Sequence, residues 1–167
     1  MAAETGAGVR AARTLDGGIL FRRWLGCWID FIAAAGLAVL SIIPIAVLGP
    51  VTDSKAILAV LFALVAIVAY FTVTEGLSGR SLGKLITGTI VVNAAGDPPG
   101  LGRALVRTLF RLVEANPFLL GGIPAGLVAA LTPNHQRLGD LAAGTYVVPV
   151  KKLASVPRNP GIVGVFD

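Results

Sequence analysis

The aspartate within a long apolar segment is the residue of this sequence that most needs a chemical explanation. Asp30 is the only charged residue between Trp24 and Gly49, and an isolated carboxylate inside a bilayer costs several kcal/mol. Its side chain must therefore be protonated, paired with a cation or in contact with water. Three interpretations stay open: a structural ion pair, a site that responds to protons or cations, and a surface charge that reaches the headgroups.

Arginines of a later segment are candidate partners for Asp30. They recur every four residues at Arg103, Arg107 and Arg111, and this spacing predicts one basic stripe along a helix. Such a stripe either lies in the headgroup plane or turns inward toward buried carboxylates. The inward alternative predicts an ion cluster of Arg23, Asp30, Glu75, Arg107, Arg111 and Glu114.

One twelve-residue motif is written twice. SLGKLITGTIVV at 81–92 and RLGDLAAGTYVV at 137–148 agree at seven positions. Each copy predicts a short helix, a glycine in a left-handed cap and a β-branched strand. The two strands could pair if they lie on one side of the membrane. Lys84 and Asp140 occupy equivalent positions and are predicted to form a salt bridge, whose contribution near water would be modest.

The repeat extends upstream. Arg23 and Asp30 are seven residues apart, as are Arg107 and Glu114, and seven residues are two helical turns, so each pair lies on one face. We therefore predict an internal duplication, with a chance match of the second pair as the alternative.

Composition decides the class of protein. Of 167 residues, 55% are hydrophobic and only 14% are charged, where a soluble domain carries about 25% charged residues. The net charge of +5 gathers at the ends of apolar segments, which fits lipid headgroups rather than nucleic acid. Motifs for a catalytic nucleophile, a metal or a cofactor are not found, so we expect no enzyme, no metal and no cofactor.

Two segments are long enough to cross a bilayer, at 24–49 and 56–75. Pro44 is expected to kink or end the outer part of the first. Arginines and lysines precede the first span and follow the second, which predicts that both flanks are cytoplasmic.

The third apolar region, 103–132, is interrupted by Ala115-Asn116-Pro117. A single crossing would place the basic residues after it outside, against the positive-inside bias. A broken helical hairpin would return the chain to the cytoplasm, and we favour it. The expected fold is an all-α integral membrane protein with a small cytoplasmic strand pair. Its predicted parts are a flexible cytoplasmic tail at 1–18, a membrane domain at 19–148 and a second flexible cytoplasmic tail at 149–167.

These motifs together resemble the RDD family of bacterial membrane proteins, which is named for one Arg and two Asp. The resemblance rests on RRWLGCWID, EGLSGRSLGKLITGTIVV, RALVRTLFRLVE and RLGDLAAGTYVV. It assigns the Arg to Arg23, the first Asp to Asp30 and the second to Asp140. Glu114 stands where many relatives have Asp, and Gly26 stands where Ala is usual. The family is widely described as of unknown function, with transport suggested and cation/proton exchange proposed for some members.

The leading hypothesis is transport, or assistance to transport, of an ion or small solute through the buried Arg/carboxylate cluster. The competing hypothesis is a structural or accessory subunit of a larger membrane complex. A chain this short offers few helices to enclose a pathway, so we expect a homo-oligomer or other membrane subunits, in contact with the lipid bilayer. The expected location is the bacterial inner membrane, as a multi-pass protein with both termini cytoplasmic.

Overall fold

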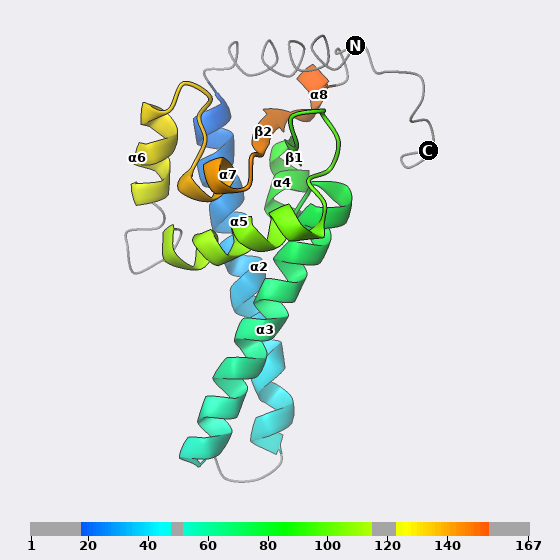
Figure 1. Ribbon diagram of the computed structural model, residues 1–167. Coiled ribbons are helices and arrows are strands. Elements are labelled where there is room, and N and C mark those ends of the chain that lie inside the picture. The colour runs from blue at the N-terminus through cyan, green and yellow to red at the C-terminus, as the bar shows by residue number, and fades with distance from the viewer. Residues whose placement is uncertain (1–17, 48–51, 115–122, 154–167) are drawn as a thin grey trace.

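The computed structural model describes residues 18–47, 52–114 and 123–153. They form a mostly helical fold with one small sheet (Figure 1). In chain order the elements are α2 (Ile19–Val47), α3 (Asp53–Ser78), α4 (Leu82–Thr87), β1 (Thr89–Val92), α5 (Leu101–Glu114), α6 (Ile123–Leu131), α7 (Leu138–Ala142), β2 (Tyr146–Pro149) and α8 (Val150–Leu153).

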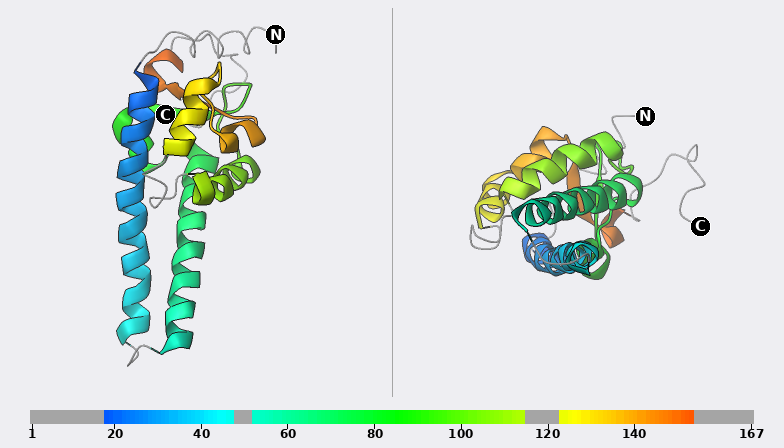
Figure 2. Two further views of the ribbon diagram at one scale, coloured as in Figure 1. Left: turned by 90° about the vertical axis from the view of Figure 1, so that its left-hand side faces the viewer. Right: turned by 90° about the horizontal axis from the view of Figure 1, so that it is seen from below.

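The two long helices α2 and α3 run side by side as a rod, and all shorter elements gather at one end of it (Figures 1 and 2). Within the described residues these are the two helices that are long and apolar enough to cross a membrane. Both predicted spans are therefore helices, although each begins before its predicted start. Pro44 lies inside α2 and does not end it, since the helix continues to Val47.

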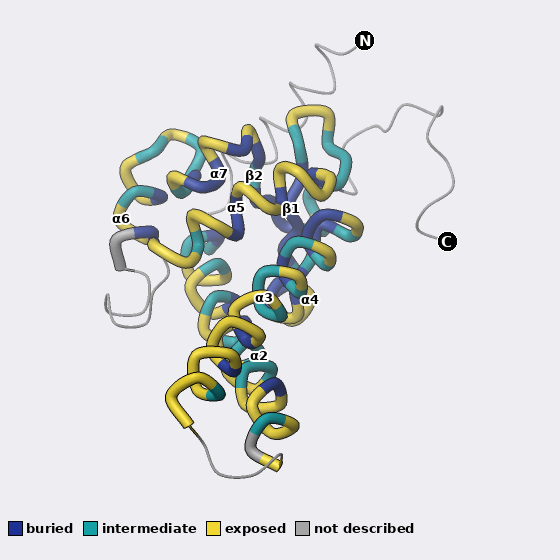
Figure 3. Tube along the Cα trace, turned by 60° about the horizontal axis from the view of Figure 1, so that its bottom comes forward, coloured by how far each residue is buried: buried dark blue, intermediate teal, exposed yellow. Residues whose placement is uncertain are grey.

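Apolar side chains cover the outside of this rod. Leu40 and Val65 are each 64% exposed, and exposed residues predominate at the far ends of both helices in Figure 3. Soluble proteins rarely expose apolar surface on this scale, because its burial is the main driving force of folding in water. Such a surface is compatible with a lipid environment.

The two copies of the repeated motif form the predicted strand pair. β1 and β2 are antiparallel, with Ile90 opposite Val148 and Val92 opposite Tyr146. Gly88 and Gly144 precede them at φ +66° and +60°, the left-handed conformation that glycine adopts without steric cost. The small sheet packs its apolar residues against α8 through Leu153.

The described part of the third apolar region consists of the short helices α5 and α6. The break at Ala115-Asn116-Pro117 lies outside the described residues, so the hairpin stays a prediction. α5 lies across α3, whereas α6 stands beside the end of α2 that carries the arginines (Figures 1 and 2). The two helices are thus not laid along each other, and neither is long enough to span a bilayer.

The predicted boundary of the second tail is wrong. Pro149 belongs to β2, and the next four residues form α8, so structure continues to Leu153. Of the two predicted tails, residues 1–17 and 154–167 lie outside the described residues.

The polarity of α5 is inverted relative to a helix on a soluble protein. Its charged residues Arg107 and Glu114 are buried at 3% and 7% exposure, while Leu109 and Val113 are 50% and 69% exposed. A helix of this kind is stable where its outer face meets lipid and its inner face meets other charges. Two arginines of the basic stripe, Arg107 and Arg111, therefore turn inward to Glu75, whereas Arg103 stays exposed.

Candidate functional site

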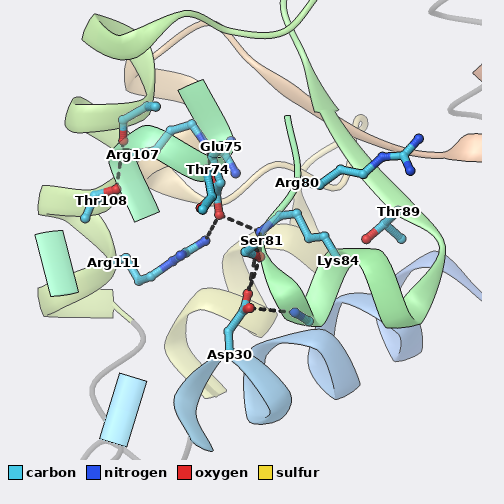
Figure 4. Close-up of polar contacts among 12 residues, drawn as sticks. Asp30, Thr74, Glu75, Arg80, Ser81, Lys84, Thr89, Arg107, Thr108 and Arg111 are labelled. Carbon is cyan, nitrogen blue, oxygen red and sulfur yellow. Dashed lines mark hydrogen bonds and ion pairs between the residues drawn. The ribbon is translucent and has the colours of Figure 1, made fainter. Parts of the chain in front are cut away.

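Glu75, near the end of α3, is the centre of the buried charge cluster (Figure 4). Its side chain is fully buried and lies 2.7 Å from Lys84 Nζ, 3.2 Å from Arg107 Nε and 2.5 Å from Arg111 Nη2. The Arg111 guanidinium also stacks over Phe71, 4.0 Å from the ring centroid. One carboxylate thus joins α3 to α4 and to α5.

Asp30 is held by the segment that precedes and begins α4. Its Oδ2 accepts a hydrogen bond from Ser81 Oγ at 2.6 Å, and its Oδ1 accepts one from the Gly83 backbone N–H at 2.7 Å. Lys84 Nζ lies 3.8 Å away. The predicted partners Arg23, Arg107 and Arg111 form no salt bridge with Asp30, because their guanidiniums are engaged by Glu75 and Asp140.

Asp140, in α7, is the second buried carboxylate with several cationic partners. Arg23 Nη2 lies at 2.5 Å, Arg137 Nε at 3.8 Å, and Arg107 Nη1 donates to its Oδ1. Arg107 Nη1 also donates to Thr145 Oγ1, at 2.6 Å. Burial alone would raise the pKa of Asp140, but the three arginines outweigh it and lower that pKa below its ordinary value.

The predicted salt bridge between Lys84 and Asp140 is therefore wrong. Lys84 pairs with Glu75 and Asp30, and Asp140 pairs with arginines. Among the described residues, the ion pairs of Lys84 and those of Asp140 are connected through the salt bridge between Glu75 and Arg107. Sequence equivalence located both residues in the cluster, but it carried no information about which charge each would face.

Glu114 is the least engaged of the predicted carboxylates. Among the described residues its hydrogen-bond donor is the Gly139 backbone N–H, at 3.1 Å, and no salt bridge joins it to a described cation. Burial raises the pKa of Glu114 above its ordinary value.

Positive charge is in excess in this cluster. Five cations, Arg23, Lys84, Arg107, Arg111 and Arg137, share the three carboxylates of Asp30, Glu75 and Asp140 in salt bridges. Burial lowers the pKa of Lys84 to about 8, although Glu75 acts in the opposite direction. Three buried guanidinium nitrogens lack a hydrogen-bond partner among the described residues: Arg23 Nη1, Arg107 Nη2 and Arg111 Nη1.

A cavity of about 560 Å³ lies against this cluster. It is lined by parts of α2, α3, α4, α5 and α6 and by single residues of β1 and β2. Charged, apolar and aromatic side chains all contribute to its wall. Its charged lining consists of Arg22, Arg23, Asp30, Lys84, Arg111 and Arg137, and its aromatic lining consists of Phe21, Trp24, Phe31 and Phe71.

The profile of the RDD family matches residues 18–144, which is about three quarters of the chain and holds the whole cluster. The chain belongs to the RDD family. Comparisons with curated proteins and with solved structures found no match.

In this RDD family protein the residues that the resemblance assigned to the family's name do not form one triad. Arg23 and Asp140 are in contact, 2.5 Å apart. Asp30 instead fastens α4 to α2. The signature thus marks two separate contacts, which Lys84, Glu75 and Arg107 connect.

Two members of the site were missed by the sequence reasoning. Ser81 was not singled out, although its place just before a short helix is typical of a helix N-cap. Arg137 was not included in the predicted cluster either. The spacing of Arg137 and Asp140 was a usable signal, since an acid three residues after a helix N-cap often accepts from its backbone N–H, and here Asp140 Oδ2 does so at 3.2 Å.

Proposed function

We propose that this protein transports, or assists the transport of, an ion or small solute, and that the charge cluster beside the cavity is the site that responds to it. The observation that carries the proposal is the pair of Arg23 and Arg111. Both line the cavity, and each has a buried guanidinium nitrogen for which the described part of the chain supplies no hydrogen-bond partner. A purely structural clamp gains nothing from unsatisfied buried donors, since each costs about 1–3 kcal/mol.

The sign of the surplus charge favours an anionic solute. From the sequence, Asp30 suggested a site for protons or cations, but its carboxylate already accepts from Ser81 and Gly83. The unsatisfied groups at the cavity are cationic, and an anion would complete their hydrogen bonds.

We further propose a multi-pass arrangement in the bacterial inner membrane with both termini cytoplasmic. The short elements and the arginines of α2 would then lie on the cytoplasmic side, in keeping with the positive-inside bias. Two helices of spanning length cannot enclose a pathway, so transport would require a homo-oligomer or other membrane subunits. No enzymatic role is proposed.

Internal duplication is supported by matching contacts. The Gly83 N–H donates to Asp30 and the Gly139 N–H donates to Glu114, and both glycines stand at the same position of the repeated motif. Asp30 and Glu114 are also the acids of the two Arg/acid pairs predicted to correspond. We infer that α2, α4 and β1 on one side, and α5, α7 and β2 on the other, are diverged copies of one unit.

An accessory or structural subunit is the second candidate. The observation that favours it is Asp30, whose two oxygens are both used to fasten residues 81–83 to α2. In such a subunit the cluster would fix the helices, and the protein would act through its partners.

Flux through proteoliposomes tests the first candidate. Purified protein is reconstituted, and the movement of sodium, potassium, chloride, phosphate and protons is followed for the wild type, Arg111→Gln and Asp30→Asn. Flux of an anion that falls in Arg111→Gln, with the variant still folded, supports the anionic proposal. No flux of any ion from the wild type would exclude autonomous transport and favour the accessory role. A cation flux abolished by Asp30→Asn would restore the cation interpretation.

A further inference from the structure

We propose that the cavity beside α2 binds the phosphate headgroup of an anionic phospholipid, and that the acyl chains of this lipid lie along the apolar part of the same cavity. The proposal goes beyond transport, because a lipid can occupy this site whether or not any solute moves.

The charged part of the wall suits a phosphate group. Arg22, Arg23, Lys84, Arg111 and Arg137 face the cavity, against the single carboxylate Asp30. Guanidinium groups bind phosphate oxygens through two parallel hydrogen bonds and are weakly hydrated, so they suit a site that is partly dehydrated.

Two arginines that line the cavity have a donor nitrogen without a hydrogen-bond partner among the described residues. The Arg23 side chain is 10% exposed and that of Arg111 is 12% exposed, and the Nη1 atom of each is buried without a partner. Each guanidinium uses its other terminal nitrogen for a carboxylate, Asp140 for Arg23 and Glu75 for Arg111. Those ion pairs hold both guanidinium groups at the cavity wall, and an anion that enters would have to draw the buried Nη1 atoms out to bind them.

Repulsion among the cations would also be relieved by an anion. Burial lowers the pKa of Arg137, and the nearby charges of Arg23, Arg111 and Arg107 lower it further, while Asp140 opposes them. The site carries positive charge that its own carboxylates do not balance.

The length and polarity of the cavity favour a lipid over a free phosphate ion. Its lining on α2 runs from Leu20 to Ala34, a distance of roughly 20 Å at 1.5 Å per residue. The arginines lie near the start of this stretch, and apolar Phe31 and Ala34 lie near its deeper end. A free ion would fill only the charged part and leave the apolar part without a ligand.

The outer surface of α2 at this level supports contact with lipid. Phe21, Trp24, Trp28 and Phe31 form a row of aromatic ring contacts, and their side chains are 38–64% exposed. Tryptophan is enriched in the headgroup region of a bilayer, so Trp24 and Trp28, close to the arginines in the sequence, mark the depth at which a lipid could enter the cavity.

Tryptophan quenching measures this binding. The sequence has two tryptophans, so the Trp28→Phe variant leaves Trp24, which lines the cavity, as the single reporter. The full chain in neutral detergent is titrated with phosphatidylglycerol that carries brominated acyl chains, or with phosphatidylcholine that carries the same chains. We expect phosphatidylglycerol to quench at about tenfold lower mole fraction, since charge-assisted hydrogen bonds distinguish the headgroups.

Charge variants and matched controls connect this preference to the cavity. Arg111→Gln and Arg137→Gln should each reduce the preference about tenfold, and Arg111→Lys should restore part of it. Arg103→Gln removes one positive charge from an exposed position of α5, the helix that carries Arg111. Arg103 lies outside the cavity lining, so this variant should leave the preference unchanged.

A filling variant tests the site without removing charge. Gly126 lines the cavity, and a Cβ added there meets nothing within 4 Å, so Gly126→Leu should occupy the apolar part and abolish selective quenching. Ala130→Leu changes an exposed residue of the same helix outside the lining and is its control. If a charge variant fails to fold, as judged by gel filtration, the filling variant and its control decide the question.

Three results would overturn the proposal. One is equal quenching by the two phospholipids. Another is a preference that survives Gly126→Leu. The third is displacement of brominated phosphatidylglycerol by millimolar glycerol phosphate or inorganic phosphate, which would make the ligand a soluble phosphate rather than a lipid.

Discussion

The molecule contains the same local device twice, on helices of different length. We call α2, α4 and β1 the first unit, and α5, α7 and β2 the second unit. In each, an acid of the larger helix accepts from the backbone N–H of a glycine in the short helix, from Gly83 to Asp30 at 2.7 Å and from Gly139 to Glu114 at 3.1 Å. In each, a glycine with positive φ then leads into a strand.

Close approach of the short helix is also common to both units. A Cβ on Gly83 would overlap the carbonyl oxygen of Gly26, and a Cβ on Gly139 would lie 2.8 Å from Phe110 Cβ and 3.3 Å from the carbonyl oxygen of Arg107. In both units the motif glycine is needed because the larger helix lies where a side chain would be.

The units differ in what their larger helix does. α2 has 29 residues and can span a bilayer, whereas α5 has 14 and lies across α3. The motif can therefore be attached to a helix that spans or to one that lies crosswise, and it does not itself determine the crossing. Its function in both is to fix a short helix and a strand to a helix by a buried acid.

The two units also differ in the sign of the charge at the equivalent motif position, and α3 forms ion pairs with both. Lys84 of the first unit and Asp140 of the second would complement each other in sign, yet each is neutralised elsewhere. Glu75 of α3 accepts Lys84 from the first unit and Arg107 and Arg111 from the second. This third element, and not the repeat alone, holds the two units together.

Removal of this shared charge should have the largest effect. Glu75→Gln leaves Lys84, Arg107 and Arg111 without their common carboxylate, and breaking a buried ion pair from one side costs about 3–5 kcal/mol. SDS titration from dodecylmaltoside micelles measures the loss. Asp53→Asn, at the opposite end of α3 in its exposed first turn, is the control and should cost less than about 1 kcal/mol. Similar losses for the two variants would contradict the central role of Glu75.

The equivalent acids of the two units should respond unequally. Asp30→Asn weakens the hydrogen bonds that Asp30 accepts from Ser81 and Gly83 and removes its ion pair with Lys84. We therefore expect about 2–3 kcal/mol of destabilisation in the same SDS titration. Glu114→Gln should cost less than about 1 kcal/mol, because burial already disfavours its charge and an amide oxygen can still accept from Gly139. A larger loss for Glu114→Gln would show that the second unit, not the first, depends on its acid.

The sequence predicted those parts of the fold that depend on local pattern. The spans, the strand pair and the glycine turns follow from apolar length and from the repeated letters, and all are present. Part of the cluster was also predictable, since Asp30, Glu75 and Arg107 lie where water is scarce and must find partners, but Arg137 was missed and Glu114 forms no salt bridge with a described residue.

The pairing within the cluster was not predictable. Which cation meets which carboxylate depends on how α5 crosses α3 and on the close contact of α4 with α2, and neither follows from spacing along the chain. For the same reason Asp30 was assigned arginine partners, whereas the structure gives it Ser81 and a backbone N–H.

The glycine turns should respond equally in the two units. Gly88→Ala and Gly144→Ala each force a non-glycine residue into the left-handed region, at about 1–2 kcal/mol. A Cβ at Gly88 would lie 3.7 Å from Arg22 Nη1 and one at Gly144 meets nothing within 4 Å, so contacts add little to either. Both variants should have a lower midpoint temperature of thermal unfolding than the wild type, by the same amount. Gly102→Ala, in α5 and without positive φ, should be neutral or stabilising. A difference above about 1 kcal/mol between the turns would contradict their equivalence.

The smallest effect should appear on raising the pH, and it concerns the first unit alone. Because burial lowers the pKa of Lys84 from 10.5 to about 8, the unfolded chain binds more protons than the folded protein between these values. The contribution of Lys84 to the free energy of unfolding therefore rises with pH across this window, and the energetic cost of burying its charge is fully present below pH 8. Between pH 7 and 8.5 the gain should be less than about 1 kcal/mol.

SDS titration of the wild type against Lys84→Met isolates this gain, since the variant lacks the titrating group. The difference between the two proteins should shift in favour of the wild type as the pH rises, whereas a shift toward the variant would mean that the Glu75 and Asp30 pairs outweigh burial and raise the pKa of Lys84 instead. Asp140, at the equivalent position of the second unit, stays charged throughout this range because its pKa is lowered. Raising the pH therefore removes the charge of Lys84 in the first unit and leaves the charge of Asp140 in the second unit unchanged.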